Sequence, residues 1–155
     1  HGVVTGRRHD SVRPMTMGDL PTILALDRDA FGADRGFFLR RRWELYPELA
    51  WVLERKTRLA GFVLGRRGPQ WAAAGPWVVL PGEPHPEYLL GSLASEANGL
   101  PLMMGVLASN HAAVGLLHSL GLDERPSPPW RMLLGRDSAV GLSDRLYAIG
   151  TAAKG

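Results

Sequence analysis

Cysteine is absent from the 155 residues of this chain. Disulfide bridges, thiolate metal sites and a cysteine nucleophile are therefore excluded together. Long apolar runs are also absent, and none approaches the roughly 20 residues that a membrane-spanning helix needs. The first residues, HGVVTGRRHD, lack the apolar segment of a secretory signal. These absences predict a cytoplasmic protein with no membrane partner.

Lysine is nearly absent too: Lys56 and Lys154 are the only two, so sixteen of the 18 basic residues are arginines. Arginine binds phosphates and carboxylates through two parallel hydrogen bonds, so the net charge of +3 favours phosphorylated cofactors and acidic ligands. Nucleic acid is not expected as a partner, because it needs a clustered basic face and the one cluster is Arg40–Arg42. We expect this cluster on the solvated side of a helix, opposite Phe37, Phe38 and Leu45; contact with a carboxylate or ribose phosphate is the alternative.

The length and composition predict one packed domain. The chain is 45% hydrophobic and 21% charged, which is typical of a globular domain and not of a disordered chain. Residues 1–11 are polar and glycine-rich, so we expect a flexible N-terminal arm followed by a single domain over residues 12–155.

Hydrophobic periodicity and turn residues predict a mixed α/β order of elements. Strands are expected at 11–15, 49–53, 59–64, 70–80, 102–108, 130–134 and 146–149, and helices at 20–31, 37–46, 87–98 and 112–120. Asp19 stands in N-cap position for the first helix, and Gly99 and Gly121 end the last two. The strand at 70–80 contains Gly75 and Pro76, and since proline cannot donate to a sheet ladder, we predict a bulge there.

Three stretches carry a resemblance to the GNAT acetyltransferase family. They are VRPMTMGDLPTILALDRDAF (Val12–Phe31), LAGFVLGRRG (Leu59–Gly68) and NHAAVGLLHSLGL (Asn110–Leu122). The segment FGADR, the Gly-Pro strand and the final WRMLLG also look like the second halves of bacterial GNAT proteins built from two such domains in tandem. The resemblance implies an α/β (α+β) fold: a mixed β-sheet flanked by about four helices and splayed between its fourth and fifth strands.

That resemblance implies an N-acetyltransferase, which passes an acetyl group from acetyl-CoA directly to a primary amine of a small molecule or peptide. The pantetheine arm of acetyl-CoA would pair with the bulged strand, whose amides at Val78–Leu80 could hold the thioester oxygen. The residues expected at the cofactor are Trp77, Val78, Val79, Leu80, Gly82, His85, Tyr88, Asn110, Ala113 and Leu117. The wall for the amine acceptor is expected at Phe31, Arg35 and Trp43.

An amine must lose its proton before it attacks, so a general base is needed. The candidates are His85 first and Glu54 as its rival, with His111 and His118 behind, although each is also an ordinary surface residue. Asn110 is equally well explained as a helix N-cap. No histidines are spaced as metal ligands, so no metal is expected.

An alternative function remains open at this point. The family's Q/R-x-x-G-x-G/A phosphate loop is replaced by LPGEPHPEYLL, which keeps only Gly82, and Leu117 stands where the family has a tyrosine. Under this alternative, the chain is a catalytically silent GNAT-fold module that binds a ligand or a partner protein. A homodimer is possible under either interpretation.

Overall fold

The structure is a computed structural model, and it describes residues 2, 9–126 and 143–150. Its strands are β1 (Val12–Pro14), β2 (Ala50–Arg55), β3 (Arg58–Arg67), β4 (Ala72–Val79), β5 (Leu102–Met103) and β6 (Leu146–Ala148). Its helices are α1 (Leu20–Phe31), α2 (Gly36–Leu45), α3 (Glu87–Glu96) and α4 (His111–Ser119), with short 3-10 helices at Met17–Asp19 and Pro47–Leu49. The predicted mixed α/β order is confirmed, while the expected strand at 130–134 lies outside the described residues.

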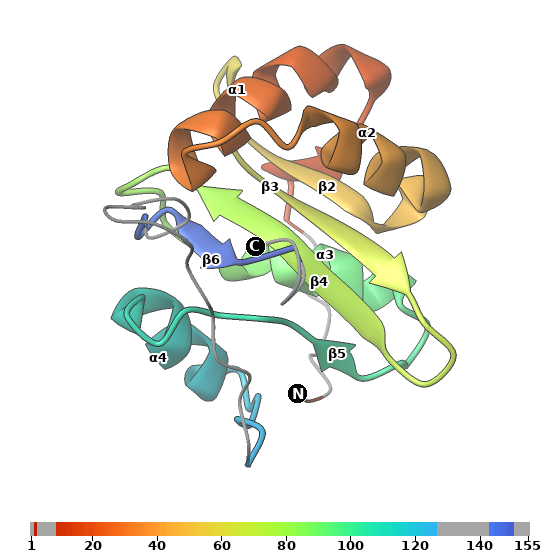
Figure 1. The fold of residues 1–155 in the computed structure, drawn as a ribbon, viewed down its shortest axis with the longest axis vertical. Helices are drawn as coiled ribbons and strands as arrows, with labels where there is room; N and C mark the ends of the chain where they lie inside the picture. The colour runs from red at the N-terminus through yellow and green to blue at the C-terminus, as the bar shows by residue number, and fades with distance from the viewer. Residues whose placement is uncertain (1, 3–8, 127–142, 151–155) are drawn as a thin grey trace.

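The strands form one mixed sheet in the order β1-β2-β3-β4-β5. Neighbours from β1 to β4 run antiparallel, β5 runs parallel to β4, and β6 pairs antiparallel with β4 (Figure 1). Both β5 and β6 therefore share the same edge of β4, one at each end of that strand.

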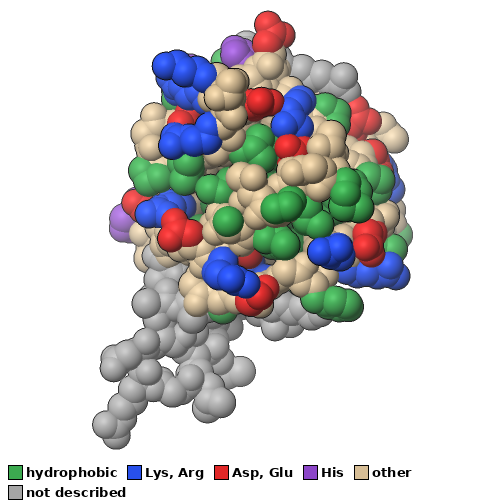
Figure 2. All heavy atoms as spheres, turned by 90° about the horizontal axis from the view of Figure 1, so that it is seen from above, with side chains coloured by type: hydrophobic (Ala, Val, Ile, Leu, Met, Phe, Trp, Pro, Cys, Tyr) green, Lys and Arg blue, Asp and Glu red, His purple; other side chains and the backbone are tan. Residues whose placement is uncertain are grey.

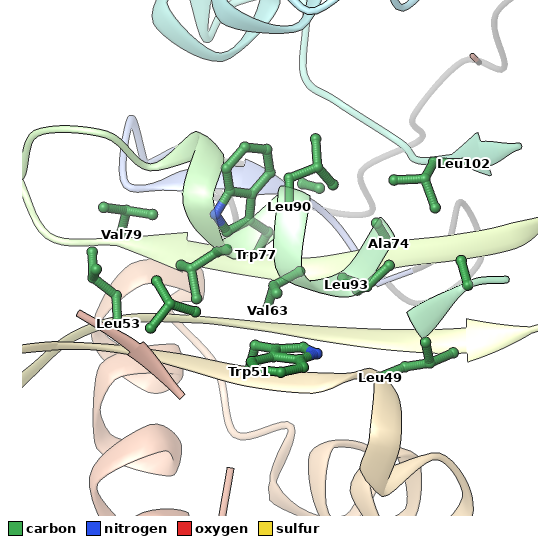
Figure 3. Packing of buried hydrophobic residues seen from close by; sticks show 14 of the residues in the cluster. Leu49, Trp51, Leu53, Val63, Ala74, Trp77, Val79, Leu90, Leu93 and Leu102 are labelled. Atoms are coloured by element: carbon green, nitrogen blue, oxygen red, sulfur yellow. The ribbon is translucent and has the colours of Figure 1, made fainter. Parts of the chain in front are cut away.

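Hydrophobic cores lie on both faces of the sheet because side chains alternate along each strand. Val78 packs with residues of α1 and α2 on one face. Trp77 and Val79 pack with residues of α3 on the other, where Figure 3 shows the indole of Trp77 beside Leu90. The middle of β4 is thus buried from both sides, and only its edge can offer backbone groups to a ligand.

The predicted bulge in β4 is confirmed. Val63 of β3 lies opposite Trp77, but Gly65 lies opposite Ala74, so Gly75 and Pro76 together face a single residue of β3. An extra residue bends a strand away from its neighbour. Here the bend falls just before the part of β4 that the family resemblance assigns to the cofactor.

The prediction for one helix face is wrong, while Asp19 holds its predicted N-cap position at α1 without a side-chain cap. Arg42 lies on the buried side of α2 together with Leu39, three residues before it, whereas Phe37 is 85% exposed. Burial of Arg42 is possible because the bulge presents the carbonyl of Gly75 as an acceptor, 3.3 Å away. The side chain of Asp19 makes no capping bond to α1, since its carboxylate accepts from Arg13 and Thr16 instead.

Charges over α1 and α2 are mixed. Figure 2 shows basic and acidic side chains interspersed with hydrophobic ones on this face. Arg40 and Arg41 are exposed, and Arg41 lies 3.4 Å from Glu44. The arginine cluster is therefore split between solvent and core, and this face lacks the uniform positive surface that nucleic acid favours.

The fifth strand is much shorter than expected. The sequence predicts a strand over 102–108, but only Leu102 and Met103 pair with β4, opposite Ala72 and Ala73. The chain then leaves the edge of β4 and continues toward α4 (Figure 1). On β5 itself, Leu102 also pairs with Gly2, near the N-terminus, through two backbone hydrogen bonds.

Candidate active site

The sheet opens between β4 and β5, as the family resemblance implies. Their pairing stops at Ala73 and Met103, next to the bulge at Gly75 and Pro76. Beyond that point the edge of β4 from Trp77 to Val79 is no longer covered by β5. This stretch is the one expected to meet the pantetheine arm of acetyl-CoA.

The open edge is occupied by β6. Trp77 lies opposite Ala148 and Val78 opposite Leu146, and the amide of Val79 donates to the carbonyl of Arg145 at 3.0 Å. On its other side the same segment reaches the β5 end of the gap, where the Ile149 amide donates to the carbonyl of Gly105 at 2.8 Å. The sequence predicts a strand at 146–149 but contains no signal for its neighbour.

The cofactor arm does not fit this arrangement of the backbone. The amides of Val79 and Leu80, two of those expected to hold the thioester oxygen, already donate to the carbonyls of Arg145 and Ala60. Each amide has one hydrogen to give, so the Val79 donor is not available to a ligand while the β6 segment stays in place, and the Leu80 donor is held by β3 in either case.

Trp77 marks the middle of the occupied gap. Its indole is fully buried, and its ring packs against Tyr147 of β6 with centroids 4.9 Å apart. Burial raises the pKa of the Tyr147 phenol above its ordinary value. Within the described part of the chain, Nε1 of Trp77 has no hydrogen-bond partner, which is unusual for a buried indole.

Asn110 is a helix N-cap, as one of the two interpretations predicts. Its side-chain oxygen accepts from the amide of Ala113 at 3.0 Å. Its Nδ2 donates to the carbonyls of Asp144 at 2.9 Å and Leu146 at 3.1 Å, so the same side chain also holds the β6 segment. The proposed contact with the cofactor remains a prediction, as it does for Ala113 and Leu117, which are buried in the α4 packing.

The loop before α3 brings His85 and Tyr88 together. The two rings stack with centroids 5.0 Å apart, and His9 of the N-terminal arm stacks on Tyr88 at 4.5 Å. The exposed His85 imidazole places Nδ1 3.0 Å from a carboxylate oxygen of Glu87. Gly82 has a left-handed backbone, which fits a tight turn.

A cationic hollow of about 320 Å³ lies beside this loop. It is lined by Arg55, Lys56, Thr57, Arg58 and Glu83. The carboxylate of Glu83 is largely buried and lies 3.0 Å from Arg55. Lys56 and Arg58 have no carboxylate partner in the part of the chain that the structure describes. The sequence predicts no site here, because the hollow joins the turn between β2 and β3 to Glu83 from the distant loop before α3.

Glu54 lies away from the gap. It is on β2, which is separated from β4 by β3, and it accepts a hydrogen bond from Arg13 at 2.7 Å. The Arg13 guanidinium also holds Asp19 through two bonds of 2.8 Å. No described contact joins Glu54 to His85, so the two candidate bases do not form one site in this conformation.

The expected acceptor wall is partly a structural unit. Arg35 donates to both carboxylate oxygens of the fully buried Asp27, at 2.6 and 3.0 Å, and its guanidinium lies 3.7 Å from the centre of the Phe31 ring. Trp43 packs, partly buried, against the same core. This arrangement ties α1 to the start of α2, and the role of the three residues toward an acceptor stays a prediction.

Arg42 links α2 to the bulge and was not predicted at the site. Besides its bond to the Gly75 carbonyl, its guanidinium lies over the ring of Phe38 at 4.9 Å. Burial, helped by the positive charge of Arg66, lowers the pKa of Arg42 to about 10. Its position depends on a carbonyl exposed by a distant bulge, which helix periodicity does not reveal.

A model of the acetyltransferase (GNAT) domain matches residues 23–148. This match covers most of the chain and includes both β4 and β6. The chain belongs to the GNAT acetyltransferase family. No match was found among curated proteins.

Solved structures support the same fold. The chain is similar to a GNAT-family protein from Novosphingobium aromaticivorans, with a TM-score of 0.62 and 21% identity over 81% of this chain and 56% of that one. An acetyltransferase of the GNAT family from Bacillus cereus gives a TM-score of 0.56 with 16% identity over 71% of this chain and 80% of that one. An integron cassette protein from a salt-marsh metagenome gives a TM-score of 0.53 with 17% identity over 83% of this chain and 91% of that one. The chain thus spans just over half of the Novosphingobium protein.

Several expectations from the sequence are not tested by these findings. None of the described helices is long and apolar enough to cross a bilayer, and the cytoplasmic location remains a prediction. The tandem arrangement, the homodimer and the single-domain boundaries also stay predictions. In the described ranges no three His, Asp or Glu side chains gather as a metal site, and the expectation of no metal likewise stays a prediction.

Proposed function

We propose that this chain is an N-acetyltransferase domain that transfers the acetyl group of acetyl-CoA to a primary amine of a small molecule or peptide. The observation that carries the proposal is the parting of β4 from β5 next to the bulge, in a chain whose family is that of GNAT acetyltransferases. An acyl-CoA with an extended amide arm is the kind of ligand that such a strand edge can accept.

The reaction class is acyl transfer to nitrogen. A chain without cysteine offers no thiol to carry the acetyl group, which favours direct transfer to the amine over a covalent enzyme intermediate. Of the candidate bases, His85 lies nearer in sequence to the end of β4, and its Nδ1 lies 3.0 Å from a carboxylate oxygen of Glu87.

The phosphates of acetyl-CoA need cations or free amides to bind them. Lys56 and Arg58 offer positive charge in the hollow beside the loop, where Glu83 already engages Arg55. This hollow, rather than the shortened loop alone, is our candidate for the phosphate end of the cofactor.

A second function is favoured by a specific observation. Because β6 covers the edge of β4, a domain that never opens would bind no acyl-CoA and would serve as a structural or partner-binding module. The two functions differ in one measurable property, which is whether acetyl-CoA binds to the folded chain at all.

Thermal unfolding with and without excess acetyl-CoA distinguishes them. A ligand at a hundred times its Kd stabilises the folded state by about 2.7 kcal/mol, which corresponds to roughly 5–10 °C in Tm for a chain of this size. Release of free CoA thiol with a panel of amines, such as a polyamine, an amino acid and a peptide N-terminus, then tests turnover. An unchanged Tm together with no thiol release would leave the silent module as the better account.

A further inference from the structure

The β6 segment has the position of a bound ligand. It lies between the separated parts of β4 and β5, and it is bonded to the backbone of both sides. Asn110, the N-cap of α4, also holds the segment, because its side chain donates two hydrogen bonds to the carbonyls of Asp144 and Leu146. It is therefore held in the gap by an extended-chain pairing of the same kind as that expected of pantetheine.

The fit of the segment is close. A Cβ atom added to Gly75 would lie 2.2 Å from the carbonyl oxygen of Ile149, and one added to Gly105 would lie 2.8 Å from the Ile149 side chain. Tyr147 also covers the ring of Trp77. No room is left in this conformation for a second extended chain along the same edge.

We propose that the segment Ser143–Ile149 is an internal competitor of acyl-CoA, and that the cofactor binds the edge of β4 only when this segment leaves it. The inference rests on the proposed function, because it takes the β4 edge as the cofactor site. Only the molecules in which the edge of β4 is free can bind acetyl-CoA. The apparent Kd of the protein is then the Kd of the open form divided by the fraction of molecules that are open.

The paired segment is short, which makes an exchange possible. β6 has three residues, and its pairing with β4 comprises two residue pairs. Outside the core it is held by the partly exposed ion pair between Arg145 and Asp29 of α1. Exposed ion pairs contribute little, so this contact can be removed without disrupting the fold.

A disulfide staple tests the competition directly. Val78 and Leu146 are directly paired across β4 and β6, so cysteines at both positions are suited to a disulfide that holds the segment in place. The chain has no cysteine of its own, so the double variant V78C/L146C forms only that bridge. The probe is desulfo-CoA, which cannot exchange with thiols, and the reductant is a phosphine.

The expected result is that the oxidised V78C/L146C variant binds desulfo-CoA at least tenfold more weakly than its reduced form. The matched control is R66C/A73C, a staple between β3 and β4 at the other end of β4, which should bind equally in both redox states. Equal affinity of oxidised and reduced V78C/L146C, with binding retained, would overturn the competition and leave the proposed function standing.

A milder pair of variants guards against poor folding of the stapled protein. Arg145→Ala and Asp29→Ala break the same ion pair from its two ends, and each should tighten binding of desulfo-CoA by up to about fivefold. Unchanged affinity in both would contradict the competition. Failure of the wild type and of every variant to bind desulfo-CoA would overturn the proposed function itself, and the inference with it.

Discussion

The side-chain amide of Asn110 donates to the carbonyl of Leu146, thirty-six positions further along the chain, at 3.1 Å. The oxygen of the same amide caps α4 by accepting from the Ala113 amide. One side chain therefore joins the start of α4 to the strand that covers the β4 edge, and loss of its NH2 group should affect only the second of these contacts.

Asn110→Asp separates the two contacts. Aspartate keeps an acceptor for the cap but offers no donor to the Asp144 and Leu146 carbonyls. Amide exchange should remain slow in α4 and become fast in β6. Asn110→Ala loses both contacts and should lower the free energy of unfolding by about 2–3 kcal/mol in urea titrations. The control is His111→Ala at the exposed neighbouring position, and equal exchange in β6 for all three variants would contradict the role of the Asn110 amide in holding β6.

Gly75→Ala should move β6 away from the bulge. The new Cβ would lie 2.2 Å from the Ile149 carbonyl oxygen, and the glycine has a φ of +143°, so both crowding and backbone strain oppose the change. We expect a loss of about 2–4 kcal/mol in urea unfolding. Gly82→Ala is the matched control, because its φ is +76° with no atom within 4 Å, and it should cost only about 1 kcal/mol. Similar losses for both variants would mean that the contact with Ile149 is unimportant.

Arg35→Ala should mainly lower the free energy of unfolding, rather than weaken the binding of an amine acceptor. The change leaves the carboxylate of Asp27 buried without the guanidinium that neutralises it. Removal of one partner of a buried pair costs about 3–5 kcal/mol, which chemical denaturation would detect. Arg28→Ala, which breaks the exposed pair with Asp34, should cost less than about 1 kcal/mol. A stable Arg35→Ala protein with impaired binding of the amine would instead support the acceptor role.

The Arg13–Asp19 pair predicts a loss of stability in acid. The hydrogen bond from Arg13 holds the pKa of the Asp19 carboxyl well below its usual range, and the Thr16 amide lowers it further. A carboxyl whose pKa is lower in the folded state stabilises the fold above its unfolded pKa of about 3.9, and this contribution is lost as the pH falls below that value. The free energy of unfolding should therefore fall between pH 5 and pH 2, and less steeply for Asp19→Asn. Identical slopes for the two proteins would contradict this assignment.

Local signals in the sequence predicted the elements well. Gly121 after α4 and the Asn110 cap act within one helical turn, and the Gly75-Pro76 pair specifies a bulge wherever the strand lies. These features depend on residues close in the chain, and patterns along the sequence record them directly.

Long-range pairing decided the parts that were missed. The burial of Arg42 depends on a carbonyl thirty-three positions away, and the placement of Leu146 depends on a strand edge that β5 leaves after two residues. The apolar run at 102–108 resembles a complete strand, but beyond Met103 its side chains pack against the two cores while its backbone no longer pairs with β4. The family resemblance indicated where the gap lies, and the structure showed what fills it.

The most direct test of this account is amide hydrogen exchange, measured residue by residue by NMR with and without saturating acetyl-CoA. The amides of Val79 and Ile149 report on the two sides of the gap, because they donate to the carbonyls of Arg145 and Gly105. We predict that acetyl-CoA accelerates exchange at Ile149, which loses its partner, while Val79 stays protected by the cofactor arm. Saturation with acetyl-CoA that leaves Ile149 as protected as before would contradict the claim that the gap held by β6 is the cofactor site.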